Sequence, residues 1–135
     1  LVESCGAVIV GEDHDMGNRI FMGPEMDASE PVASITDFYH LRFPASKKSL
    51  VSERVSLLVD QVKKTKAQAV IFYINKFDDA ASWDYTEQMK AMKDIGVPVL
   101  LLRDQPYVMK GHEELREIIG RFIESVGADG KEDGK

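Results

Sequence analysis

The sequence predicts an α/β protein with three layers, in which a short parallel sheet lies between helices, as in half of a Rossmann or flavodoxin-like fold. Residues 69–74 and 97–102 are continuous apolar runs, as expected for strands buried on both faces of a parallel sheet. A helical pattern separates them, and this strand–helix–strand order is typical of a right-handed crossover. A third apolar run, residues 7–10, predicts a further strand that ends at Gly11.

Apolar residues at helical spacing predict the helices, and capping residues predict their ends. Ser29 before Pro31 indicates the start of the first helix, and Ser49 the start of the second. Gly96 should end the helix between the two main strands, and Gly127 the last helix. The second helix carries an apolar stripe formed by Val51, Val55, Leu58 and Val62.

The composition bounds the class of protein. With 135 residues the chain can form one domain with its own core. A net charge of −6 argues against a nucleic-acid partner, and no apolar run approaches the roughly 20 residues that span a bilayer. We therefore expect a cytoplasmic protein. The single cysteine, Cys5, excludes an intrachain disulfide and a zinc–thiolate or iron–sulfur site built from this chain alone.

We expect the domain to cover residues 1–126, and the polar, glycine-rich segment 127–135 to be disordered. The first residue is Leu1 rather than methionine, and residues 1–6 resemble the tail of a helix that leads into a strand. Three strands are also few for a sheet of this type. The sequence is therefore expected to be a fragment of a longer chain.

Polar residues follow each of the three predicted strands. Because the carboxyl ends of parallel strands share one edge of a sheet, these residues should gather at a single site. One interpretation is a site for Mg²⁺ or Ca²⁺, since both ions prefer oxygen ligands. The other is that the loops are acidic because the protein is acidic and helix starts favour aspartate. The residues concerned are Asp13, Asp15, Arg19, Asp78, Asp79, Arg103 and Asp104.

Several sequence words together resemble the C-terminal domain of the 2-hydroxyacyl-CoA dehydratase D-component family, which includes the benzoyl-CoA reductase subunits. The most specific is AVIFYINKFDDAASWDY at 69–85, followed by MKAMKDIGVPVLLLRDQPY at 89–107. ESCGAVIVGED at 3–13, RFP at 42–44 and GHEELREIIGRFIES at 111–125 are also similar. The resemblance covers nearly the whole chain in the right order.

This resemblance implies a role in anaerobic metabolism, as part of a two-domain subunit of a radical enzyme. Such a subunit holds a [4Fe–4S] cluster through cysteine thiolates and works beside a homologous subunit. An ATP-dependent activator supplies one electron to the cluster. The acyl-CoA substrate then loses water, as in a lyase, or an aromatic ring is reduced, as in an oxidoreductase.

The chain departs from the family at its cysteines. Asp78 stands where the family commonly has a cluster-ligating cysteine, Asp15 stands at a second cysteine position, and Ala45 lies where a third is often found. The resemblance places Asp78 at the cluster edge as a metal ligand through oxygen, with Lys76 and Trp83 shaping the pocket and Asp15 opposite.

Carboxylate is a hard ligand and a poor replacement for thiolate. Three hypotheses therefore stay open. The subunit binds a cluster with Asp78 as one ligand, or it is a cluster-free accessory subunit that contacts a catalytic partner. The third is a flavodoxin-like domain that binds a small ligand without catalysis of its own.

Overall fold

Two parallel strands form the middle layer of the part of the chain that the computed structural model describes, which comprises residues 1–14, 27–42, 49–108 and 111–129. Strand β1 (Val70–Asn75) pairs with β2 (Val99–Gln105), and α4 (Asp79–Asp94) connects them. This is the strand–helix–strand unit that the apolar runs predict.

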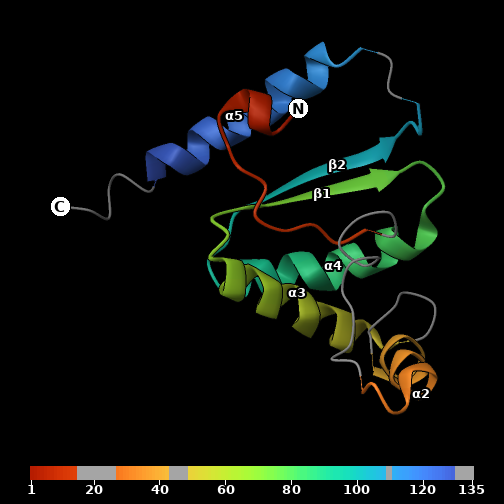
Figure 1. The fold of residues 1–135 in the computed structure, drawn as a ribbon. Coiled ribbons are helices and arrows are strands. Elements are labelled where there is room, and N and C mark those ends of the chain that lie inside the picture. The colour runs from red at the N-terminus through yellow and green to blue at the C-terminus, as the bar shows by residue number, and fades with distance from the viewer. Residues whose placement is uncertain (15–26, 43–48, 109–110, 130–135) are drawn as a thin grey trace.

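Helices cover both faces of this sheet (Figure 1). On one face, α3 (Val51–Thr65) lies beside α4. On the other lies α5 (Glu113–Asp129), which contacts the short 3₁₀ helix η1 (Glu3–Cys5). The three-layer α/β arrangement predicted from the sequence is therefore confirmed. No helix within the described ranges combines the length and the apolar character needed to cross a membrane.

The core lies between the sheet and its helices. The register pairs Val70 with Val99 and Tyr73 with Leu102. Gly96 adopts φ +72°, the left-handed conformation expected of the glycine that ends α4. In the described residues, the buried apolar side chains come from both strands and from α3, α4 and α5. They are Val62, Ile74, Met92, Leu102 and Ile119.

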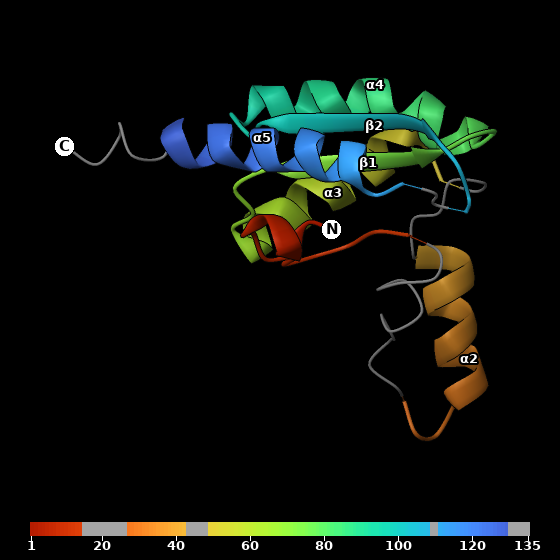
Figure 2. The same ribbon diagram turned by 90° about the horizontal axis from the view of Figure 1, so that it is seen from above.

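Residues 7–10 are not a strand, which corrects one sequence prediction. The segment runs on the β1 side of the sheet, away from β2 (Figures 1 and 2), but forms no ladder with it. Val8 is 77% exposed, although its β-branched side chain favours a strand. Strand propensity depends on pairing and burial, and neither is present for these residues.

Two predicted caps are also wrong. In each case the residue after the predicted serine is the actual N-cap. Ser29 instead donates its N–H and its hydroxyl to Asp27 Oδ1, at 2.8 and 2.6 Å. The carbonyl of Ser49 accepts a hydrogen bond from Arg54. Both serines thus form hydrogen bonds just outside the helix. A serine near a predicted helix start does not by itself show whether it caps the helix or bonds to such neighbouring groups.

Gly127 does not end the last helix, because α5 continues to Asp129. A glycine inside a helix costs about 1 kcal/mol relative to alanine, which weakens a helix without ending it. Of the predicted tail, residues 130–135 lie outside the described residues.

The helical segment 31–42 stands away from the three layers (Figure 2). It comprises α2 (Pro31–Thr36) and the π-helix η2 (Asp37–Arg42). Pro31 occupies the first turn, as predicted. Val32 on this segment is 75% exposed.

Candidate functional site

The turn after β1 and the end of β2 lie together at the carboxyl edge of the sheet. The N–H of Lys76 donates to the carbonyl of Gln105 at 2.8 Å, which joins the two segments. Parallel pairing places them at one edge, where α/β proteins bind ligands. We call residues 75–79 the β1–α4 turn.

The residues predicted to reach this edge from the segment after residues 7–10 are not placed there by the structure. Asp13 lies on a segment that does not follow a strand. Asp15 and Arg19 lie outside the described residues, as does Ala45. The edge described by the structure therefore consists of the β1–α4 turn and the end of β2.

The β1–α4 turn is tight and contains an unusual backbone conformation. The carbonyl of Asn75 accepts a hydrogen bond from the N–H of Asp78 at 3.1 Å. Phe77 adopts φ +69°, a left-handed conformation that glycine takes readily and a bulky residue rarely does. Its ring is 83% exposed and lies 5.2 Å from Nζ of Lys76. The turn thus holds an aromatic ring in solvent at a cost in backbone strain.

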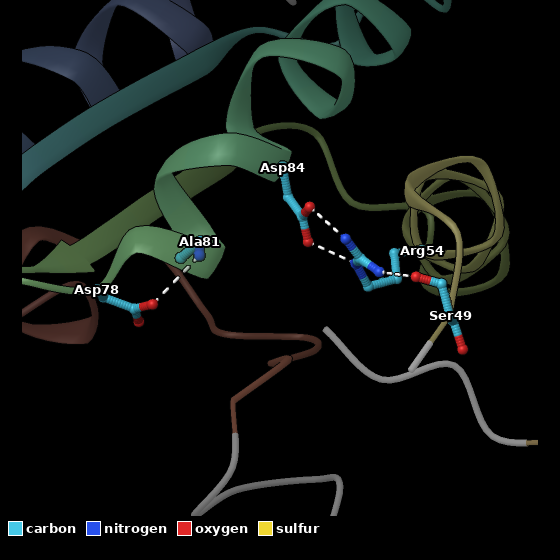
Figure 3. A network of polar contacts seen from close by, with 5 residues as sticks. All are labelled: Ser49, Arg54, Asp78, Ala81 and Asp84. Carbon is cyan, nitrogen blue, oxygen red and sulfur yellow. Dashed lines mark hydrogen bonds and ion pairs between the residues drawn. The ribbon is translucent and has the colours of Figure 1, made fainter. Parts of the chain in front are cut away.

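Asp78 is the N-cap of α4. Its Oδ1 accepts a hydrogen bond from the N–H of Ala81 at 3.2 Å (Figure 3), and its carbonyl accepts one from the Ser82 hydroxyl at 2.8 Å. Asp79 follows in the first turn, where a negative charge suits the helix dipole. Both carboxylates therefore have a structural reason to be here, independent of any ligand.

The end of β2 is irregular. Between the pairs Tyr73–Leu102 and Asn75–Gln105, β2 contains one extra residue. Asp104 lies in this bulge with φ +57°, a conformation that aspartate tolerates better than most residues. Arg103 and Asp104 therefore belong to the end of the strand. The sequence had predicted that both follow the strand, in the next loop. Bulges often re-aim side chains beside functional sites.

A cavity of about 390 Å³ adjoins this edge, between the end of β2 and the start of α5. This volume is within the usual range for small-ligand sites. Its walls combine apolar side chains with the polar groups of Arg103, Gln105 and Glu114. The lining residues are Leu101, Leu102, Arg103, Gln105, Pro106, Gly111, Glu114, Leu115 and Ile118.

The geometry bears on the oxygen-ligand metal hypothesis. Among the described residues, no group of three His, Cys, Asp or Glu side chains could hold a metal ion.

Trp83 on α4 is 77% exposed, so its indole is accessible to a ligand or to a partner surface. Lys76 is exposed as well.

Sequence reasoning missed a buried ion pair beside this edge. Arg54 on α3 and Asp84 on α4 are only 7% and 5% exposed. Nε of Arg54 donates to Oδ2 of Asp84 at 2.5 Å, and Nη2 donates to Oδ1 (Figure 3). The signal was available, since Arg54 interrupts the apolar stripe of its helix. Asp84 likewise lies eight residues before Met92, on the buried side of α4.

The comparisons with known proteins agree with the sequence resemblance. The chain is 25% identical over 126 residues to the (R)-phenyllactyl-CoA dehydratase beta subunit of Clostridium sporogenes, an alignment that covers 93% of this chain and 33% of that protein. The chain thus spans about a third of this curated relative. No solved structure matches it. The family model of the 2-hydroxyglutaryl-CoA dehydratase D-component matches residues 1–126, and the chain therefore belongs to that family.

Proposed function

We propose that this chain is an α/β domain of a 2-hydroxyacyl-CoA dehydratase-type subunit, and that its sheet edge contributes to binding of the acyl-CoA thioester. The family match and the Clostridium relative support the substrate class. The observation that carries the proposal is the β1–α4 turn, which lies at the carboxyl edge of the sheet, beside a cavity lined by both polar and apolar side chains.

The edge carries groups suited to an acyl thioester. Lys76 and Arg103 supply positive charge for the phosphates of coenzyme A, in a chain of net charge −6. The exposed indole of Trp83 offers a flat apolar surface. The leucine-lined cavity is of a size to accept an acyl group.

The donor set does not fit a [4Fe–4S] cluster held by this chain alone. Such clusters are bound by thiolates, and the single cysteine of the sequence, Cys5, lies in η1 with its thiol directed at the carbonyl of Arg116 at 3.6 Å. Asp78 offers a hard oxygen that already caps α4.

We therefore favour the cluster-free form of the proposal. The chain keeps the family fold and contacts a homologous subunit, which holds the cluster and receives electrons from the ATP-dependent activator. Acyl dehydration is the favoured reaction of the assembled enzyme, and benzoyl-CoA-type reduction is the alternative.

Binding can be tested by titrating the purified protein with phenyllactyl-CoA, 2-hydroxyglutaryl-CoA and free coenzyme A, while following tryptophan fluorescence. We expect acyl-CoA to quench Trp83. Lys76→Ala should weaken binding about two- to fivefold, which corresponds to one exposed ion pair of about 0.5–1 kcal/mol. Lys64→Ala, at an exposed lysine near the end of α3, is the matched control. If neither thioester binds, the proposal is wrong.

Iron analysis after anaerobic purification tests the cluster question separately. The cluster-free proposal expects a colourless, iron-free protein. A brown protein that loses its iron in Asp78→Asn would show instead that Asp78 is a ligand. Asp78→Cys restores one thiolate at this position, so if iron binds through this residue the cysteine variant should keep the iron that Asp78→Asn loses.

A further inference from the structure

The Arg54–Asp84 pair lies at the junction of α3 and α4, close to the candidate site. Besides its two bonds to Asp84, the Arg54 guanidinium donates through Nη1 to the carbonyl of Ser49, just before α3 (Figure 3). One side chain therefore connects α4 both to α3 and to the segment that enters it.

Stability alone is a weak explanation for this pair. Removing two charges from water is costly, and well-packed apolar residues in place of a buried ion pair often leave a protein equally or more stable. A guanidinium–carboxylate pair with two parallel bonds does something that apolar contacts do not, because it fixes both the distance and the angle between its partners.

The neighbours of Asp84 show which part of α4 is fixed. Tyr85, the next residue, places its ring edge-on to that of Phe72 in β1, with centroids 5.2 Å apart. Two consecutive residues therefore anchor α4 to α3 and to the sheet, while Trp83 before them stays exposed.

Asp84 lies six residues after the N-cap Asp78, which is about 9 Å along the helix axis at 1.5 Å per residue. An α-helix transmits a shift over this distance almost rigidly. Any slippage of α4 against α3 therefore moves the β1–α4 turn.

We propose that Arg54 and Asp84 are positioning residues, whose buried pair fixes the register of α4 against α3 and thereby places the β1–α4 turn at the sheet edge. The structural part of this inference stands by itself. Its consequence for acyl-CoA binding rests on the proposed function.

The test replaces both charges by apolar residues of similar size, in Arg54→Met/Asp84→Leu. The matched control, Asp60→Leu/Lys64→Met, makes the same chemical change at exposed positions of α3. Thermal unfolding reports stability, whereas Trp83 emission and amide hydrogen exchange at Lys76, whose N–H bonds the carbonyl of Gln105 in β2, report the position of the β1–α4 turn.

We expect the apolar pair to melt at or above the wild-type temperature. We also expect shifted Trp83 emission and at least about tenfold faster exchange at Lys76, because a shifted turn weakens its bond to Gln105. The control should change neither readout. Unchanged exchange and emission in a stable variant would overturn the inference. Unfolding would overturn it too, because the pair would then supply stability and not position.

Asp84→Glu gives a second, independent test. It keeps the charge but lengthens the side chain by one methylene, so a paired but displaced α4 should again show faster exchange at Lys76. Wild-type exchange in this variant would contradict the inference. If the unmodified protein binds no acyl-CoA, the proposed function fails, while these readouts still decide the positioning role.

Discussion

The left-handed conformation of Phe77 makes a measurable prediction about the β1–α4 turn. A non-glycine residue at φ +69° costs about 1–2 kcal/mol relative to its relaxed backbone. Because the ring is 83% exposed, its replacement loses little burial. Phe77→Ala retains the Cβ and hence the strain, whereas Phe77→Gly removes it. The greater freedom of the unfolded chain with glycine offsets about 0.5–1 kcal/mol of this gain in stability.

The glycine variant should therefore be more stable than the alanine variant by about 0.5–1 kcal/mol. Comparison of two variants cancels the loss of the ring and of its contact with Lys76. Urea unfolding with equal slopes gives this difference directly. Ser52 in α3, which is exposed, provides the control pair. At this helical position Ser52→Ala should be more stable than Ser52→Gly by a similar amount. The reasoning is refuted if Phe77→Ala is as stable as Phe77→Gly.

Three further predictions concern charged groups. Asp84→Asn replaces the carboxylate partner of the buried Arg54 guanidinium by a neutral amide, and should lower the free energy of unfolding by about 3–5 kcal/mol; a loss below about 1 kcal/mol in urea would contradict the buried pair. Asp78→Ala removes the α4 cap and should cost about 1 kcal/mol by the same assay, with an unchanged stability counting against the cap. Hydrogen bonds from the Ser29 side chain, and then from its backbone N–H, lower the pKa of Asp27 below its ordinary 3.8. The stabilisation linked to this group is therefore present above pH 3.8 and is lost as pH falls through the lowered pKa. In Ser29→Ala, carbon-detected NMR titration should find a higher pKa for Asp27 than in the wild-type protein. An unchanged pKa would refute the conclusion that the Ser29 side chain lowers it.

The sequence predicts those parts of the fold whose cause is local. The apolar run 69–74 has no polar face, and Gly96 fits the one backbone conformation that ends α4. Both signals depend only on neighbouring residues, so both are confirmed. The predicted strand at residues 7–10 has the same composition but lacks a hydrogen-bonded neighbour. Composition reports the preference for a strand, whereas the ladder is decided by tertiary structure.

The candidate site shows the same division. Parallel order alone predicts that the β1–α4 turn meets the end of β2, because that follows from topology. The bulge at Asp104 and the pairing of Arg54 with Asp84 depend on the distance between elements remote in sequence, which a single sequence does not give. One charged residue, however, lies within the apolar face of each of these two helices, and the two charges have opposite signs. Considered together, they indicate a buried ion pair.

The cap gives Asp78 a structural role at the position where the sequence resemblance leads us to expect a cysteine. Aspartate is among the best N-cap residues because its oxygen accepts a hydrogen bond from an early helix N–H, as Asp78 does from Ala81. A thiol is a much weaker acceptor at the same place. A carboxylate therefore caps the start of α4 better than a thiol would at this position. The Arg54–Asp84 pair holds the other side of this helix start, so two separate sets of polar contacts fix the β1–α4 turn at the sheet edge.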